Sequence, residues 1–226
     1  MSKFITASIG RKFIMSISGL FLMVFICVHL GLNLLLIFDD SGELFNLGAH
    51  FMATNPLIKV MEPILGLGFI IHIVWSFMIS YQNYKARPVK YATSSKTPTT
   101  SWASRNMLVL GALVLVFLII HLYNFFFVIK YQPDQLSTIV VDGTEMHNTY
   151  ALVAGLFKTN SLFCVIYMLA GILLGLHLGH GFWSAFQTIG WNNKVWMKRL
   201  QVIGRIYATL VAIGFVLIPL YFLIKF

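Results

Sequence analysis

Five long runs of apolar residues determine most of what this chain can fold into. They cover approximately residues 13–38, 60–84, 105–131, 160–189 and 202–225. Each run contains at least the roughly 20 residues that a helix needs to cross about 30 Å of hydrocarbon. Backbone groups in lipid must be hydrogen-bonded within their own segment, and these runs lack the alternation of barrel strands. The sequence therefore predicts an all-α integral membrane protein, with residues 1–226 forming one transmembrane domain of five helices.

The composition agrees with that prediction. Of the 226 residues, 58% are hydrophobic and 10% are charged, and the mean hydropathy is +0.83. Ordinary soluble domains are less apolar. The first run is too long for the core of a cleavable signal peptide, and we expect none. Cys27 and Cys164 lie in separate predicted helices, which favours packing roles over a disulfide or a metal site.

The charged residues predict the orientation of the helices. Most basic residues lie in the N-terminal segment and in the second and fourth connections: Lys3, Arg11, Lys12, Lys85, Arg87, Lys90, Lys96, Arg105, Lys194, Lys198, Arg199 and Arg205. The acidic residues lie on the other side: Asp39, Asp40, Glu43, Glu62, Asp134, Asp142 and Glu145. The positive-inside rule then places the N-terminus in the cytoplasm and the C-terminus outside. Because the basic residues gather at membrane boundaries, we do not expect the net charge of +9 to bind nucleic acid.

The first four apolar runs each contain a histidine, which is a costly residue in lipid and by default a functional one. At about 1.5 Å per residue, His29 and His121 fall in the outer half of the membrane and His177 in the inner half. His72 is near the middle of the membrane, and it lies closer to the inner side if Glu62 marks the outer boundary. In an up-down four-helix bundle, helices one and three are diagonally opposed, as are helices two and four. We therefore expect His29 to pair with His121, and His72 with His177.

Two histidines that face each other across a bundle can hold a haem iron from both sides. The spacing thus predicts two bis-histidine haems b, stacked across the membrane within the first four helices. Spacing alone leaves His177 and His180 as alternative ligands, because residues three apart share a helix face. His50 and His147 lie in polar loops and are expected to be solvated.

Glycines near these histidines allow two interpretations. Gly171, Gly175 and Gly179 recur at every fourth residue, and Gly66 and Gly68 lie about one turn from His72. Such small residues admit either a flat ring or a closely packed helix. Elsewhere, the turn-rich connection between Tyr131 and Asn160 is long enough to cap the outer end of the bundle. The fifth helix is expected to pack against the outside of the other four.

Several local motifs accompany the four histidines. They are Ser8-Ile-Gly-Arg-Lys12, Ser18-Gly19-Leu20, His29-Leu30, Ser104-Arg105-Asn106-Met107 and His177-x-x-x-Gly181-x-Trp183. Over essentially its whole length, the chain resembles the cytochrome b subunit of bacterial succinate dehydrogenase or fumarate reductase. The resemblance is to the five-helix, two-haem (b558) type of bacteria such as Bacteroidetes.

The resemblance implies roles for the histidines. His29 and His121 would bind the distal haem b, and His72 and His177 the proximal haem b, with His177 as the ligand in place of His180. The subunit would lie in the bacterial cytoplasmic (inner) membrane. On its cytoplasmic face it would bind an iron–sulfur subunit and a flavoprotein with covalent FAD, and the basic inner loops would be the docking surface.

The resemblance also implies an electron-transfer function. Electrons would pass between the iron–sulfur clusters and a membrane quinone through the two haems, while the succinate or fumarate chemistry takes place on the flavoprotein. We expect menaquinone, although the residues leave ubiquinone open, as they do the direction of the reaction. Glu43 and Glu62 are weaker candidates for proton transfer to quinone. No residue of this chain is expected to be catalytic towards the dicarboxylate.

Two other functions fit the same pattern of residues. One is a dihaem cytochrome b of another respiratory complex, such as a hydrogenase or formate dehydrogenase. The other is a haem-free transporter in which the histidines carry protons or a metal ion. A reduced-minus-oxidised spectrum separates the transporter from the cytochromes, and the identity of co-purifying soluble subunits separates the two kinds of cytochrome.

Overall fold

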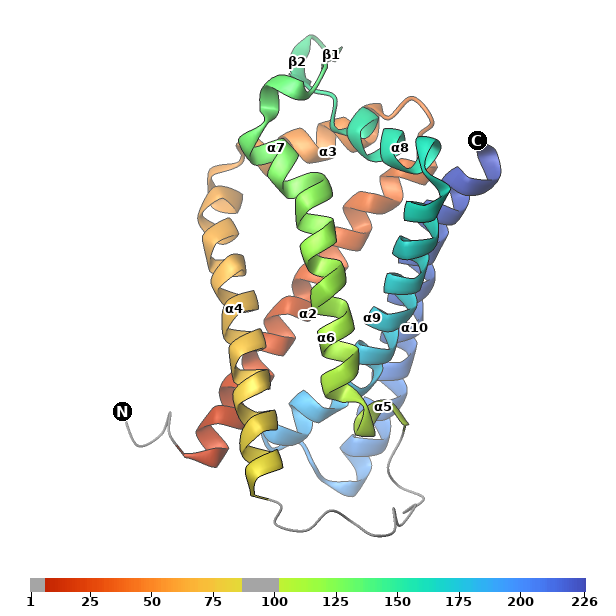
Figure 1. The fold of residues 1–226 in the computed structure, drawn as a ribbon. Coiled ribbons are helices and arrows are strands. Elements are labelled where there is room, and N and C mark those ends of the chain that lie inside the picture. Colours follow the sequence, from red (N-terminus) through yellow and green to blue (C-terminus); the bar gives the residue numbers. More distant parts are fainter. Residues whose placement is uncertain (1–6, 87–101) are drawn as a thin grey trace.

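The computed structural model describes residues 7–86 and 102–226, most of which are helical (Figure 1). Within these residues, five helical segments are long and apolar enough to cross a membrane: α2 (Ser8–Phe38), α4 (Pro56–Lys85), Met107–Tyr131, α9 (Ser161–Thr188) and α10 (Lys194–Lys225). Many of their apolar side chains are exposed, as expected for helices that face lipid. The prediction of five apolar helices suited to a multi-pass membrane protein is therefore confirmed.

The third of these segments is not a uniform α-helix. After the short helix α5 (Trp102–Arg105), α6 runs from Met107 to His121, and a π-helical turn, η1 (Leu122–Phe127), follows it directly. The segment ends in α7 (Val128–Tyr131). The hydropathy of this run gives no sign of the π-helical turn.

Asparagine side chains fix where several helices begin. Asn55, Asn160 and Asn193 each accept hydrogen bonds from the backbone N–H groups two and three residues later, at 2.9–3.4 Å. Such caps satisfy N–H groups that have no partner within the helix. As a result, α4 begins at Pro56 and α10 at Lys194, earlier than the predicted starts near residues 60 and 202. Hydropathy marks the apolar part of a helix, whereas the cap marks its first turn.

Short elements gather at one end of the long helices, which we name the cap end (Figure 1). They are α3 (Glu43–Thr54), the 3-10 turn η2 (Pro133–Gln135), the strands β1 (Thr138–Val141) and β2 (Thr144–His147), and α8 (Thr149–Thr159). Asp142 and Gly143 join the antiparallel strands with φ of 50° and 75°, as a two-residue hairpin turn of the I′ type requires. The opposite end is named the α5 end.

An apolar cluster joins α3 and α8 to the long helices at the cap end. Phe45 of α3 and Phe157 of α8 are buried together with Leu36 of α2, Cys164 of α9 and Phe222 of α10. The connection from Tyr131 to Asn160 was expected to cap the bundle, and its C-terminal part does so as the ordered helix α8. His50 was expected to lie in a polar loop, but it belongs to α3, because Phe45 and its neighbours bury one face of that segment.

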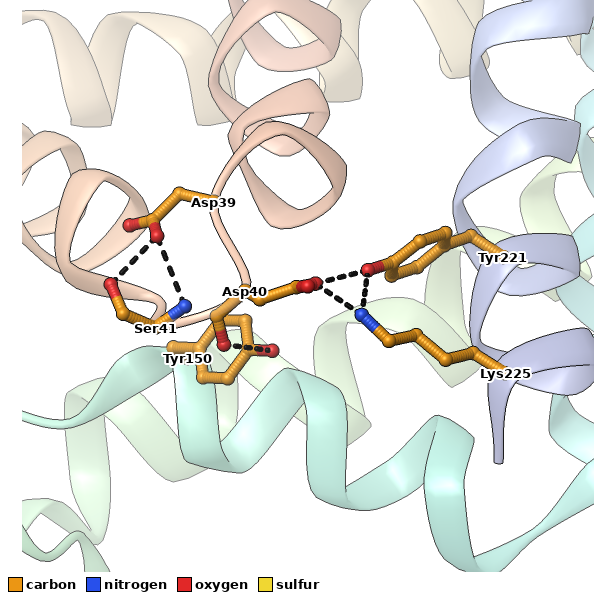
Figure 2. A network of polar contacts seen from close by, with 6 residues as sticks. All are labelled: Asp39, Asp40, Ser41, Tyr150, Tyr221 and Lys225. Carbon is orange, nitrogen blue, oxygen red and sulfur yellow. Dashed lines mark hydrogen bonds and ion pairs between the residues drawn. The ribbon is translucent and has the colours of Figure 1, made fainter.

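A polar network also ties the cap to the end of α10 (Figure 2). The Asp40 carboxylate accepts hydrogen bonds from the Tyr221 hydroxyl and the Lys225 ammonium group, and the Tyr150 hydroxyl donates to the Asp40 carbonyl at 3.3 Å. The hydrogen bond from Lys225, followed by that from Tyr221, lowers the pKa of Asp40. The pKa of Asp39 is also lowered, chiefly by the Leu44 N–H, so both carboxylates are ionised at neutral pH.

Buried Asn46 connects α3 with α8, and we expect its replacement to weaken the cap. Its side-chain oxygen accepts the Tyr150 N–H at 2.8 Å, and its side-chain NH₂ donates to the side-chain Oδ1 of Asn148 at 3.1 Å. Asn46→Ala leaves the Tyr150 N–H without its acceptor and is expected to cost about 1–3 kcal/mol. Thermal unfolding in detergent measures this loss, with the exposed Gln135→Ala as control. Equal melting temperatures for the two variants would contradict the connecting role of Asn46.

Among the long helices, α2 packs against α4 and α9, α6 packs against α9, and α10 packs along α9 and α2. Glycines account for the closeness of α9 and α10. A Cβ atom on Gly175 would lie 2.6 Å from the Ala212 Cβ, and one on Gly171 would lie 3.3 Å from the Phe215 Cβ. The glycine repeat of α9 therefore faces α10, which decides between its two interpretations in favour of helix packing.

Candidate functional site

The first pair of histidines lies toward the cap end. His29 of α2 and His121, the last residue of α6, place their ring centroids 5.5 Å apart, with the ring planes at 88°. We name them the cap-end pair. These residues are 92 positions apart in the sequence, and the two helices bring them together at one level, as the residue count from the ends of the apolar runs predicts.

Aromatic side chains surround the cap-end pair. Phe25 stacks on His29 with centroids 5.3 Å apart, and Phe125 meets the edge of His121 at 5.4 Å. Phe117 and Tyr167 lie 5.9 and 6.1 Å from His121, and Phe215 of α10 lies 5.9 Å from His29. The two imidazoles therefore lie in a largely apolar, aromatic environment.

The second pair lies nearer the α5 end. His72 of α4 and His177 of α9 have centroids 6.4 Å apart and ring planes at 76°. We name them the α5-end pair. The Ser18 hydroxyl lies 3.3 Å from the Nδ1 atom of His72 and also donates to the Met15 carbonyl. These contacts hold His72 against α2.

Glycines on the two flanking helices face the α5-end pair. A Cβ atom on Gly19 of α2 would lie 3.2 Å from the His72 Cε1, and one on Gly111 of α6 would lie 3.5 Å from the His177 Cε1. The backbones of α2 and α6 therefore come close to the two imidazoles from either side. Gly66 and Gly68, which the sequence suggested for this role, lie elsewhere: Gly68 faces Phe21, and a Cβ atom on Gly66 would meet open space.

Buried nitrogen atoms without a hydrogen-bond partner concentrate at the same two levels. In the described part of the chain they are the Nδ1 atoms of His121, His177 and His180 and the Nε1 atom of Trp75. Two of the four belong to the paired histidines themselves. The other two lie three residues after His72 and three residues after His177. Buried polar groups normally have partners, so this concentration marks a region where polar contacts remain to be made.

The paired imidazoles fit haem iron as a donor set. A porphyrin supplies four equatorial nitrogens and leaves two axial positions, which two histidines fill in bis-histidine cytochromes. With metal–imidazole bonds of about 2.0–2.1 Å, two such rings on one metal have centres roughly 6 Å apart. The observed centroid distances, 5.5 and 6.4 Å, lie on either side of that value.

The remaining candidate residues lie apart from the pairs. Glu43 is exposed in the first turn of α3, and Glu62 of α4 forms an ion pair with Lys130 of α7 at 2.8 Å. His50 lies in α3 and exposed His147 in β2. The rings of His180 and Trp183 on α9 meet edge to face, with their centroids 4.7 Å apart. The ring that faces His72 belongs to His177.

Four features of the site were not predicted from the sequence. The π-helical turn η1 begins directly after His121, and its Asn124 donates to the Tyr167 hydroxyl at 3.1 Å. The position of Gly111 against His177 and the buried, unpartnered Nε1 atom of Trp75 were also not predicted. Gly19 belongs to the Ser18-Gly19-Leu20 motif, but nothing in the sequence showed that it faces His72. A glycine ten residues before His121 and a tryptophan one turn after His72 were the available signals, and both are common in membrane helices.

The chain was also compared with known proteins. No protein-family model, no curated protein and no solved structure matches it.

Proposed function

We propose that this chain is the dihaem cytochrome b membrane-anchor subunit of a succinate:quinone oxidoreductase, a succinate dehydrogenase or fumarate reductase. The proposal is supported mainly by the two histidine pairs, which lie at two levels and come from four separate apolar helices. In this proposal α2, α4, the Met107–Tyr131 segment and α9 form an up-down bundle that holds two haems b. Helix α10 packs outside them.

The two histidines of each pair would hold the iron of one haem. His29 and His121 hold the haem at the cap end, and His72 and His177 hold the haem at the α5 end. When bound, haem supplies one-electron redox chemistry at its iron. Two imidazoles per iron leave no open coordination position, which favours electron transfer over ligand binding. The aromatic residues around the cap-end pair keep water away, and Ser18 orients His72.

The α5 end faces the cytoplasm in this proposal and binds the iron–sulfur and FAD-containing flavoprotein subunits. Basic residues concentrate there: Lys85, Arg105, Lys194, Lys198, Arg199 and Arg205. The predicted docking residues Lys3, Arg87, Lys90 and Lys96 lie outside the described residues. The cap end then faces outward, and quinone, expected to be menaquinone, reacts near it. Glu62, paired with Lys130, and Glu43 are the candidates for quinone proton transfer.

Charge reversal tests the docking surface. Replacing Lys85, Arg87 and Lys90 together by glutamate is expected to reduce retention of the soluble subunits, because an acidic partner surface would then be repelled. The loss should be largest when the complex is washed with salt, which screens surface attraction over about 10 Å at 0.1 M. Subunit retention on affinity-purified protein measures the effect. Lys59→Glu at the opposite end of α4 serves as control, and equal retention in both variants across a salt series would contradict docking at this loop.

The subunits that co-purify with the chain test the proposal as a whole. A covalent flavoprotein and an iron–sulfur subunit, together with succinate-dependent reduction of a quinone, are the expected result. Hydrogenase or formate dehydrogenase subunits would instead assign the chain to another respiratory complex. A chain that purifies without haem or soluble subunits would favour the proton or metal transporter.

A further inference from the structure

Trp75 and His180 occupy equivalent places relative to the α5-end pair. Trp75 lies three residues after His72 on α4, and His180 lies three residues after His177 on α9. Both helices run from the cap end to the α5 end (Figure 1). At 1.5 Å per residue, each side chain is therefore attached about 4.5 Å closer to the α5 end than its neighbouring histidine.

Each of these two side chains has a buried nitrogen atom that lacks a partner. The atoms are the Nε1 of Trp75 and the Nδ1 of His180. An indole N–H can only donate, and an imidazole nitrogen donates when it carries the proton. Leaving such groups buried and unpaired is costly, and more so among apolar helices. Both positions therefore call for an acceptor that the described residues do not supply.

Haem b has two carboxylates of the required kind. Its two propionate groups leave the same edge of the porphyrin, so they extend together beyond the level of the axial ligands. A carboxylate accepts hydrogen bonds strongly, and such charge-assisted bonds are shorter and stronger than neutral ones. Donors one turn beyond each axial ligand, on the two helices that supply those ligands, match two propionates that extend toward the α5 end.

We propose that Trp75 and His180 donate hydrogen bonds to the propionate carboxylates of the haem at the α5 end. This inference rests on the proposed function, since it requires a haem between His72 and His177. It gives His180 a role other than axial ligation and fixes which edge of that haem faces the α5 end. No equivalent pair of unpartnered donors flanks the cap-end pair in the described residues.

The test compares haem affinity with and without free carboxylates. Haem-free chain is prepared in a His29→Ala, His121→Ala background, in which the α5-end site is the one that binds. It is then reconstituted with protohaem or with protohaem dimethyl ester. With protohaem, Trp75→Phe and His180→Leu are each expected to bind at least about tenfold more weakly than the background protein. With the diester, which has no carboxylate to receive the hydrogen bonds, the difference should vanish.

Two further variants control for folding. His180→Asn keeps an N–H donor near the position of Nδ1 and is expected to restore most of the affinity for protohaem. In a His72→Ala background, where the cap-end haem remains, Trp75→Phe and His180→Leu are expected to change nothing. Equal weakening with protohaem and with the diester would assign both residues to packing and overturn the inference, as would no weakening at all. A parent chain that binds no haem would instead refute the proposed function.

Discussion

Replacing His29 by alanine is expected to remove the same haem as replacing His121, and His72→Ala the same haem as His177→Ala. The imidazoles of each pair lie 5.5 or 6.4 Å apart, centroid to centroid. Loss of one imidazole leaves the iron with a single protein ligand in an apolar site. Each variant should therefore contain about one haem b in place of two. The remaining haem should titrate at one of the two parental potentials, because the two pairs have different surroundings.

A potentiometric titration monitored by absorbance and by electron paramagnetic resonance identifies which haem each variant keeps. His50→Ala on α3 is the control and should keep both haems. His180→Ala removes no iron ligand, so it should also keep both titrating components, with the α5-end haem bound more weakly. If His29→Ala and His177→Ala removed the same component, the pairing would be wrong. If His180→Ala removed a haem and His177→Ala did not, the ligand on α9 would be wrong.

Gly19→Val is expected to abolish the haem at the α5 end and to leave the cap-end haem in place. A Cβ atom at position 19 would already lie 3.2 Å from the His72 Cε1, and valine adds two methyl groups to that atom. The His72 ring would have to move, and the Ser18 contact that orients it would be lost. Haem content should fall to about one per chain, with the loss confined to the component that His72→Ala also removes.

Gly31→Val is the matched control on the same helix. A Cβ atom at position 31 would meet no atom within 4 Å, so this variant should retain both haems and similar stability. Both substitutions add the same β-branched residue to α2 and carry the same cost in helix propensity. Equal haem loss in the two variants would show that Gly19 acts through helix stability and has no specific contact with the site.

Much of this architecture can be predicted from the sequence because hydrocarbon imposes simple rules. Runs of twenty or more apolar residues are forced into helices, and a constant rise per residue converts position into depth. The levels of His29 and His121 follow from those two rules. So does the level of His177, which then selects His72 as its partner across the helices.

Other features depend on tertiary contacts that hydropathy does not record. The burial of Asn46 and Phe45 decides that segment 43–54 is a helix, although polar residues flank it. The role of the α9 glycines was ambiguous, because a neighbouring helix and a flat ring both require small residues beside them. The position of Ala212 of α10 against Gly175 shows that these glycines face a helix. The π-helical turn after His121 depends on a change in the backbone hydrogen-bonding pattern, which the residue types do not reveal.

The haem content of the purified chain shows whether its four paired histidines hold two irons. Haem extracted as the pyridine haemochrome, measured against protein concentration, should give two haems b per chain. The reduced-minus-oxidised and low-temperature resonance spectra should show both as low-spin, because each iron has two imidazole ligands. A value near two with low-spin signals is the predicted result. A value near one, a high-spin signal, or the absence of haem would contradict the assignment of four histidines to two irons.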